Sequence, residues 1–141
     1  MTTKIQNALL GGFIGTAIMT MVMMIASMLG MPKMSPPAML SEIIGLPILV
    51  GWLMHFIIGI IFAMIYAFNF KYLLKKVGDT ILKGAIFGMV VFISAQIIMT
   101  IMGKMIVMPP MEGSMVLIMV GSFIGHVIFG IIVAAFVKER S

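Results

Sequence analysis

Four long stretches of apolar residues dominate the chain, separated by short segments rich in lysine, proline and glycine. The stretches cover approximately residues 5–30, 46–70, 81–103 and 114–137. Each contains the roughly 20 apolar residues that a helix needs to cross about 30 Å of hydrocarbon. The alternation typical of barrel strands is absent, and other open structures would leave backbone groups without hydrogen bonds in lipid. The sequence therefore predicts an all-α membrane protein in which residues 1–141 form a single domain of four transmembrane helices.

The composition supports a lipid environment. The chain is 62% hydrophobic and only 9% charged, whereas soluble domains carry about 25% charged residues. It has no cysteine, which excludes disulfides, zinc–thiolate sites and iron–sulfur clusters. No nucleophile–base pair, carboxylate pair or phosphate-binding loop is present, and the four acidic residues fall at loops or ends. We therefore expect the protein not to be an enzyme.

The basic residues predict the orientation in the membrane. The net charge is +5, but the cations sit at helix ends and not in one patch, so we expect no nucleic-acid partner. On one side lie Lys4, Lys71, Lys75, Lys76, Lys83, Lys138 and Arg140. The other side has only Lys33 and Lys104, together with Glu42 and Glu112. The positive-inside rule then places both termini and the middle loop in the cytoplasm. The expected location is the bacterial inner membrane, with residues 31–45 and 107–113 facing the periplasm.

The two halves of the chain share three features in the same order. Each contains Ile-Met-Thr, at 18–20 and 98–100, followed by Met-Pro-x-Met, at 31–34 and 108–111. A histidine with a glycine four residues later follows, at His55 and at His126. We interpret this as two repeated helical hairpins related by a pseudo-two-fold axis along the membrane normal. The second and fourth spans are then diagonal, and both histidines lie in the outer half of the membrane.

Three of these segments carry a resemblance to a known group of proteins. The sequences MPKM at 31–34, GWLMHF at 51–56 and GSFIGH at 121–126 resemble an uncharacterised family of small four-helix bacterial integral membrane proteins. The resemblance covers nearly the whole chain. It implies the architecture and a bacterial membrane location, and it implies no activity and no functional residues.

The two histidines are the candidate site, because ionisable residues within a membrane are costly and usually functional. The structural alternative is that each donates a hydrogen bond to a neighbouring helix backbone or to Ser or Thr. The favoured functional hypothesis is a Cu(I) site, since thioether and imidazole suit monovalent copper. Its candidate ligands are Met31, Met34, Met108 and Met111 at the outer mouth, with His55 and His126 below. Most of the 19 methionines must instead be apolar filler.

A second cofactor hypothesis is a b-type haem with His55 and His126 as its two axial ligands. Diagonal helices would supply ligands on opposite faces of the ring. The space for a flat ring would come from glycines close to the two histidines: Gly51, Gly59, Gly121, Gly125 and Gly130. A third hypothesis is a structural accessory subunit of a larger membrane complex, or a homo-oligomer, within the lipid bilayer.

The prolines predict ordered outer loops. The first of these loops is restricted by Pro32, Pro36, Pro37 and Pro47, and the second by Pro109 and Pro110. A short helix is expected to begin near Ser35, with Pro36 at its first position, where the missing N–H is not needed.

Overall fold

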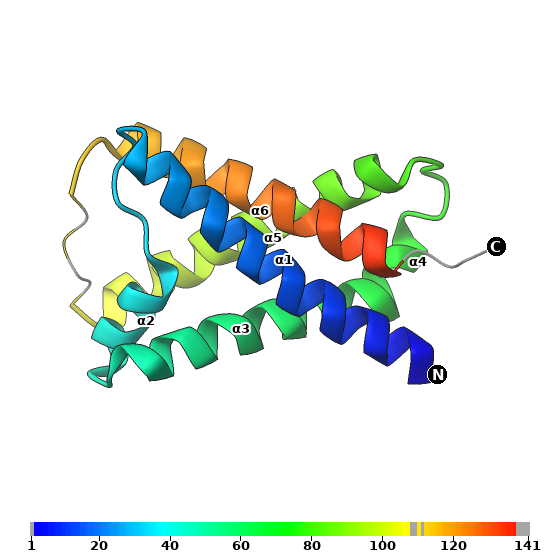
Figure 1. Ribbon diagram of the computed structural model, residues 1–141, viewed down its shortest axis with the longest axis horizontal. Coiled ribbons are helices and arrows are strands. Elements are labelled where there is room, and N and C mark those ends of the chain that lie inside the picture. Colours follow the sequence, from blue (N-terminus) through cyan, green and yellow to red (C-terminus); the bar gives the residue numbers. More distant parts are fainter. Residues whose placement is uncertain (1, 108–109, 111, 138–141) are drawn as a thin grey trace.

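The computed structural model describes residues 2–107, 110 and 112–137, and every regular element in this part of the chain is helical (Figure 1). Its elements are α1 (Thr2–Met28), α2 (Pro36–Ile44), α3 (Ile48–Ile65), the π-helical η1 (Tyr66–Phe70), α4 (Lys71–Leu73), α5 (Thr80–Met105) and α6 (Met115–Val137). Helices α3, η1 and α4 follow one another without a break and form one long rod.

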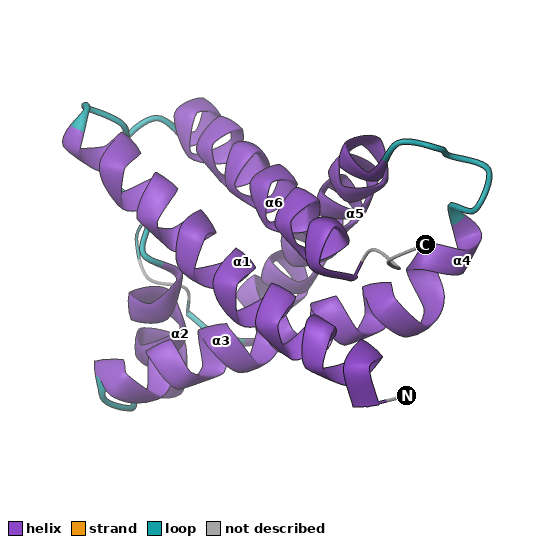
Figure 2. Ribbon diagram, turned by 45° about the vertical axis from the view of Figure 1, so that its right-hand side comes forward, coloured by secondary structure: helices purple, strands orange, loops and turns teal. Residues whose placement is uncertain are grey.

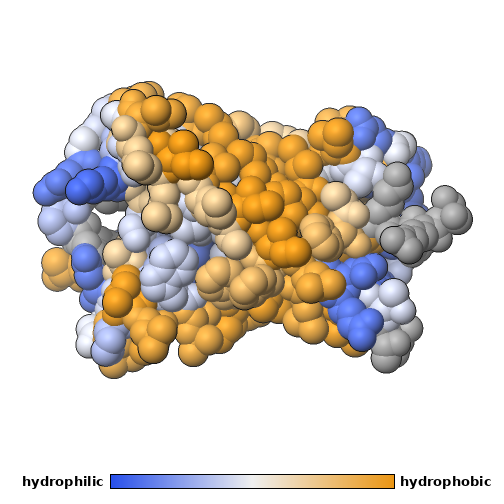
Figure 3. Space-filling view, viewed as in Figure 1, coloured by the Kyte–Doolittle hydropathy of each residue, from blue (hydrophilic) through white to orange (hydrophobic). Residues whose placement is uncertain are grey.

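Four helices are long and apolar enough to cross a membrane, which confirms the predicted all-α membrane fold. The spans run over Thr3–Met28, Ile48–Leu73, Thr80–Met105 and Met115–Val137. A helix of 26 residues is about 39 Å long, which exceeds the hydrocarbon thickness of about 30 Å. Apolar side chains cover the middle of the visible face, and polar residues gather at its two ends (Figure 3). We call these the lysine end, with Lys4, η1, α4 and the start of α5, and the proline end, with residues 29–35 and 45–47.

Helix α1 lies at the centre because two adjacent stripes along it each contact a different helix. The stripe Gly12, Thr16 and Thr20 faces α3. A methyl group placed at Gly12 would lie 2.7 Å from Cα of Ile60, and the Thr16 hydroxyl fills the place of a side chain at Gly59. Residues four apart share a helix face, and small residues there let two backbones approach in lipid.

The second stripe on α1 faces α6. It consists of Gly11, Gly15, Met19 and Met23. A methyl group at Gly15 would lie 3.0 Å from the Phe129 ring, so the glycine makes room for that ring. The stripe changes from glycine to methionine toward the proline end, and the methionines meet glycines on α6 in return.

Helix α5 packs on α6 through glycine-lined backbone contact. Gly84 and Gly88 on α5 lie against Gly130, Ile131 and Val127 on α6. The extensive contacts between spans in the described chain are α3 with α1, α1 with α6, and α6 with α5. No comparable contact joins α5 to α3, and α6 lies between α1 and α5 (Figure 2). This order leaves α3 and α6 on either side of α1.

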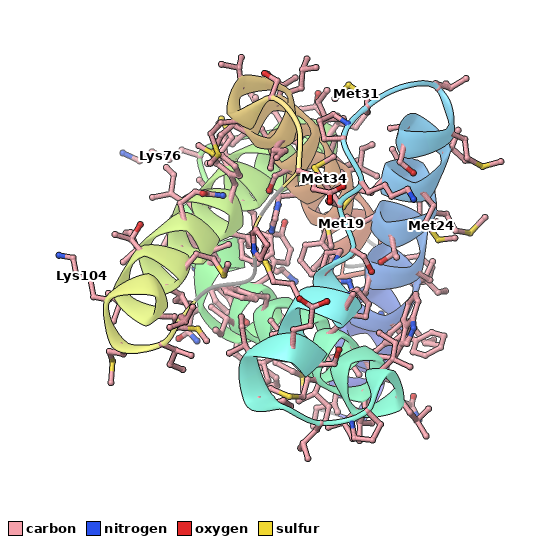
Figure 4. All side chains as sticks on the ribbon, turned by 90° about the vertical axis from the view of Figure 1, so that its left-hand side faces the viewer. Met19, Met24, Met31, Met34, Lys76 and Lys104 are labelled. Atoms are coloured by element: carbon pink, nitrogen blue, oxygen red, sulfur yellow. The ribbon has the colours of Figure 1, made fainter. Side chains whose placement is uncertain are left out.

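An aromatic cluster connects the rod α3–η1 to α5 and α6 at the lysine end. The Phe87 ring of α5 lies 4.9 Å from that of Tyr66 and 5.2 Å from that of Phe70, measured between centroids. The Phe129 ring lies 6.5 Å away on the other side of Phe87. Toward the proline end no such aromatic contact joins α5 to the rod in the described chain, and α5 lies apart from α2 and α3 (Figure 4).

The short helix α2 confirms the prediction for the first loop. It begins at Pro36 with Ser35 as its N-cap, and the Ser35 side chain accepts a hydrogen bond from Ala38 N at 3.4 Å. It ends at Gly45, whose φ of 65° is the left-handed conformation that glycine adopts freely. Helix α2 packs on α3, where Gly51 leaves space for the carbonyl of Pro37.

Candidate functional site

His55 joins α3 to α1 through a buried hydrogen bond. Its Nε2 lies 3.0 Å from the Thr20 hydroxyl, and the exposed fractions of the two residues are 7% and 5%. That hydroxyl donates its single proton to the carbonyl of Thr16 at 2.8 Å. It must therefore accept from His55, and the hydrogen-bond network assigns the proton of the ring to Nε2. The lone pair on Nδ1 is left without a hydrogen-bond partner among the described residues.

His126 on α6 makes its hydrogen bond within its own helix. Its Nδ1 lies 2.7 Å from the carbonyl of Ser122, which can only accept, so Nδ1 carries the proton. The ring lies edge-on to Phe92 of α5, with the centroids 5.9 Å apart. The Nε2 lone pair remains available. Metal-binding histidines commonly have this arrangement, because the bond from the other nitrogen to a carbonyl fixes the ring.

The two histidines belong to different helices, α3 and α6. A charge on His126 would act electrostatically on His55. His55 makes the hydrogen bond to Thr that the structural alternative expects, whereas His126 donates within its own helix, and each ring retains one lone pair. His55 lies seven residues from the start of α3 and His126 eleven from the start of α6, or about 10 and 16 Å from the proline end at 1.5 Å per residue.

Four methionines pack on one face of α6, beside Gly121 and Gly125. We call them the methionine cluster: Met19, Met23, Met31 and Met34. A methyl group at Gly125 would lie 3.2 Å from Cγ of Met19 and 3.3 Å from Sδ of Met23. One turn toward the proline end, a methyl group at Gly121 would lie 3.4 Å from Cε of Met31 and 3.2 Å from Sδ of Met34. The four thioethers thus share about one helical turn of α6, which rises 5.4 Å.

Figure 4 shows Met19, Met31 and Met34 gathered where α1, the following loop and α6 meet. Met24 instead points away from the bundle. Met19 and Met23 are 5% and 4% exposed, whereas Met21 and Met24 are 59% and 55% exposed. The cluster is therefore distinct from the methionines that face lipid.

The structure brings together two of the four methionines that the sequence proposed, Met31 and Met34. Met108 and Met111 lie outside the described residues. The second outer loop nevertheless reaches the first, because a methyl group at Gly113 would lie 3.0 Å from Cγ of Pro32.

Sequence reasoning missed Met19 and Met23. The signal was available in the spacing, because Gly11, Gly15, Met19 and Met23 recur every four residues and so share one face of α1. A methionine that continues a glycine stripe faces a neighbouring helix and not lipid.

The glycines that the haem hypothesis needed as empty space are filled by protein atoms. Met34 and Met31 cover Gly121, and Met19 and Met23 cover Gly125. Gly51, Gly59 and Gly130 meet Pro37, Thr16 and α5. Protein atoms therefore occupy the positions next to these glycines.

The candidate ligands are all uncharged. Among the residues that the structure describes, no group of three or more His, Cys, Asp or Glu could hold a metal ion. Thioethers beside neutral imidazoles are soft and borderline ligands, which suit a soft monovalent ion.

The fold and the intramembrane site together define a small multi-pass membrane protein whose polar chemistry lies inside its four-helix bundle. The chain belongs to a family of unknown function, DUF6789, whose model matches residues 2–140. This match confirms the resemblance to an uncharacterised family of small membrane proteins. No curated protein and no solved structure matches the chain.

Proposed function

We propose that this protein is a non-enzymatic membrane protein that binds Cu(I) near the proline end. The observation that carries the proposal is the methionine cluster, in which four thioethers from α1 and its following loop meet one glycine face of α6. His126 directly follows Gly125 on that helix, and Thr20, which lies between Met19 and Met23, holds His55. Thioether and imidazole therefore lie in one layer of the membrane.

The neutral ligand set favours a monovalent ion over a divalent one. The proposed ligands carry no negative charge to offset that of the metal, and the cost of placing an ion in a medium of low dielectric constant rises with the square of its charge. Thioethers are uncharged at every physiological pH, so they need no deprotonation before they bind. Each methionine has three rotatable side-chain bonds, which lets sulfurs that pack as apolar groups turn toward an ion.

The orientation completes the proposal. The positive-inside rule assigns the lysine end to the cytoplasm. The methionine cluster then lies in the outer half of a bacterial inner membrane, and the loops with Met31, Met34, Met108 and Met111 face the periplasm. A monovalent copper ion would reach the cluster from that side.

Methionine-to-leucine variants test the proposal, because leucine keeps the volume and apolar character and removes only sulfur. The first variant replaces Met31, Met34, Met108 and Met111, and the second replaces Met19 and Met23. The matched control replaces the exposed methionines Met21, Met24 and Met89. Affinity for Cu(I), measured by competition with a colorimetric chelator, should fall sharply in the first two variants and stay near the parent in the control.

Equal affinity in all three variants, or no binding by the parent, would rule out the methionine site. The haem alternative has its own readout, a Soret band from purified protein, which requires both histidines as ligands. A parent that binds neither copper nor haem would leave the accessory-subunit hypothesis.

A further inference from the structure

A cavity of about 230 Å³ opens at the lysine end, on the opposite side of the membrane from the methionine cluster. Its lining combines two lysines with small and apolar residues from three parts of the chain: Tyr66, Lys71, Gly78, Thr80, Lys83, Ala134 and Val137. A liquid water molecule occupies about 30 Å³, so the cavity has room for a group of five heavy atoms.

The Tyr66 hydroxyl is directed into this cavity. Tyr66 is only 2% exposed, yet in the described part of the chain its hydroxyl makes no hydrogen bond. Every fully buried side-chain oxygen or nitrogen in that part of the chain has a hydrogen-bond partner. Because the Tyr66 hydroxyl has no partner, it is not fully buried and must reach open space. The cavity is the space that Tyr66 lines, and the hydroxyl offers it one hydrogen-bond donor.

Lys71 and Lys83 supply the positive charge around the same space. Tyr66 begins the π-helical turn η1, which continues directly into Lys71, and such turns occur frequently at functional sites. Thr80 is the first residue of α5, and the carboxylate of its N-cap residue Asp79 offsets the partial positive charge of this helix end. The nearby carboxylate of Asp79 is not part of the lining, and it accepts a hydrogen bond from Ile81 N at 2.8 Å.

From this combination the structure assigns the cavity to a phosphate group, carried by the headgroup of an anionic phospholipid. Two ammonium groups and a phenol form a donor set that matches phosphate oxygens. Basic pockets between membrane helices are known to take acidic lipid headgroups. The exposed side chains of Ile81 and Leu82 follow Thr80 and provide an apolar surface for an acyl chain. This assignment is independent of the copper proposal.

Binding of a fluorescent phosphatidylglycerol to the full-length protein in a neutral detergent tests the assignment, with fluorescence anisotropy as the readout. The site variant is Lys71→Gln with Lys83→Gln. The control, Lys75→Gln with Lys76→Gln, removes the same charge from two exposed lysines of the same end that do not line the cavity. Each lysine that pairs directly with the phosphate should contribute about fivefold in affinity, the value for one lysine beside anionic lipid, so the site variant should lose about 25-fold. The control should lose less than about fivefold.

Tyr66→Phe separates the phosphate site from general charge attraction. It keeps the ring that packs on Phe87 and removes only the hydroxyl, so folding should survive and affinity for the lipid should fall severalfold.

Competition then identifies the source of the phosphate. Displacement of the probe by unlabelled phosphatidylglycerol but not by inorganic phosphate supports a lipid headgroup. Displacement by inorganic phosphate, lost in the site variant, supports the same site with free phosphate as its ligand. Equal losses in the site and control variants, or displacement by phosphatidylcholine as strong as by phosphatidylglycerol, would overturn the assignment.

Discussion

The hydrogen bond between Thr20 and His55 makes a quantitative prediction about how α1 and α3 hold together. Thr20→Val keeps the shape of the side chain and removes the hydroxyl that accepts from His55 Nε2 at 3.0 Å. His55→Phe removes the other partner. We expect the effects of the two changes on the free energy of unfolding to be non-additive. Either change alone abolishes the hydrogen bond, so the double variant should lose less stability than the sum of the two single variants.

The structure sets the size of the coupling. Hydrogen bonds between membrane helices contribute about 0.6 kcal/mol on average and at most about 1.7 kcal/mol. This one joins two residues that are 5% and 7% exposed, so no water can replace either partner. We therefore expect a coupling free energy of about 1 to 1.7 kcal/mol, in the upper part of that range.

Unfolding in mixed micelles of neutral detergent and dodecyl sulfate measures the coupling. The single tryptophan, Trp52, stacks on Phe56 beside the site and reports the loss of tertiary structure. The control cycle combines Thr100→Val with His126→Phe, the equivalent residues of the second half. Thr100 is exposed and donates to the carbonyl of Gln96 at 2.8 Å, so no coupling is expected there.

Two results would refute this reasoning. A coupling below about 0.3 kcal/mol between Thr20 and His55 is within ordinary additivity error and would mean that the bond does not form. An equal coupling in the control cycle would mean that Thr100 and His126 meet as well, as strict two-fold symmetry requires.

Four further predictions concern packing and topology. Gly12→Ala places a methyl group 2.7 Å from the Cα of Ile60 and should lower the free energy of unfolding by about 1–3 kcal/mol. Gly125→Ala meets only flexible methionine side chains and should stay within about 1 kcal/mol of the parent in the same unfolding assay. Gly51→Ala should push α2 off α3 through the carbonyl of Pro37 and accelerate proteolysis between residues 29 and 47. Reporter fusions at the C-terminus should show cytoplasmic activity, and periplasmic activity would reverse the proposed orientation.

The spans could be predicted from sequence because lipid leaves the backbone few options. Runs of apolar residues of the required length must be helices there, and the helix bounds differ from the expected ones by only a few residues. Helix α2 could be predicted because Ser35 and Pro36 are a local N-terminal signal that needs no tertiary contact.

The partners of the histidines could not be predicted from the repeat. Thr20 and Thr100 occupy equivalent positions in sequence, yet only Thr20 meets a histidine. The reason is long-range packing, since α1 lies between α3 and α6 while α5 contacts only α6 extensively. Local patterns specify which residues share a helix face, but they do not specify which neighbour that face meets.

The methionines illustrate the same limit. The Met-Pro-x-Met motif identified Met31 and Met34, whereas Met19 and Met23 became candidates only when Gly125 was found opposite them. Because the chain has 19 methionines, sequence alone does not tell which of them could bind a metal. Their burial in the structure separates the cluster from the methionines that face lipid.

X-ray absorption at the copper edge of the Cu(I)-loaded protein tests the central claim most directly, because it identifies the atoms bound to the metal. We predict a first shell dominated by sulfur with at least one imidazole nitrogen, and loss of the sulfur signal in the variant that replaces Met19, Met23, Met31 and Met34 with leucine. A shell of nitrogen and oxygen alone, or a parent protein that retains no copper after removal of excess ion, would contradict the copper site.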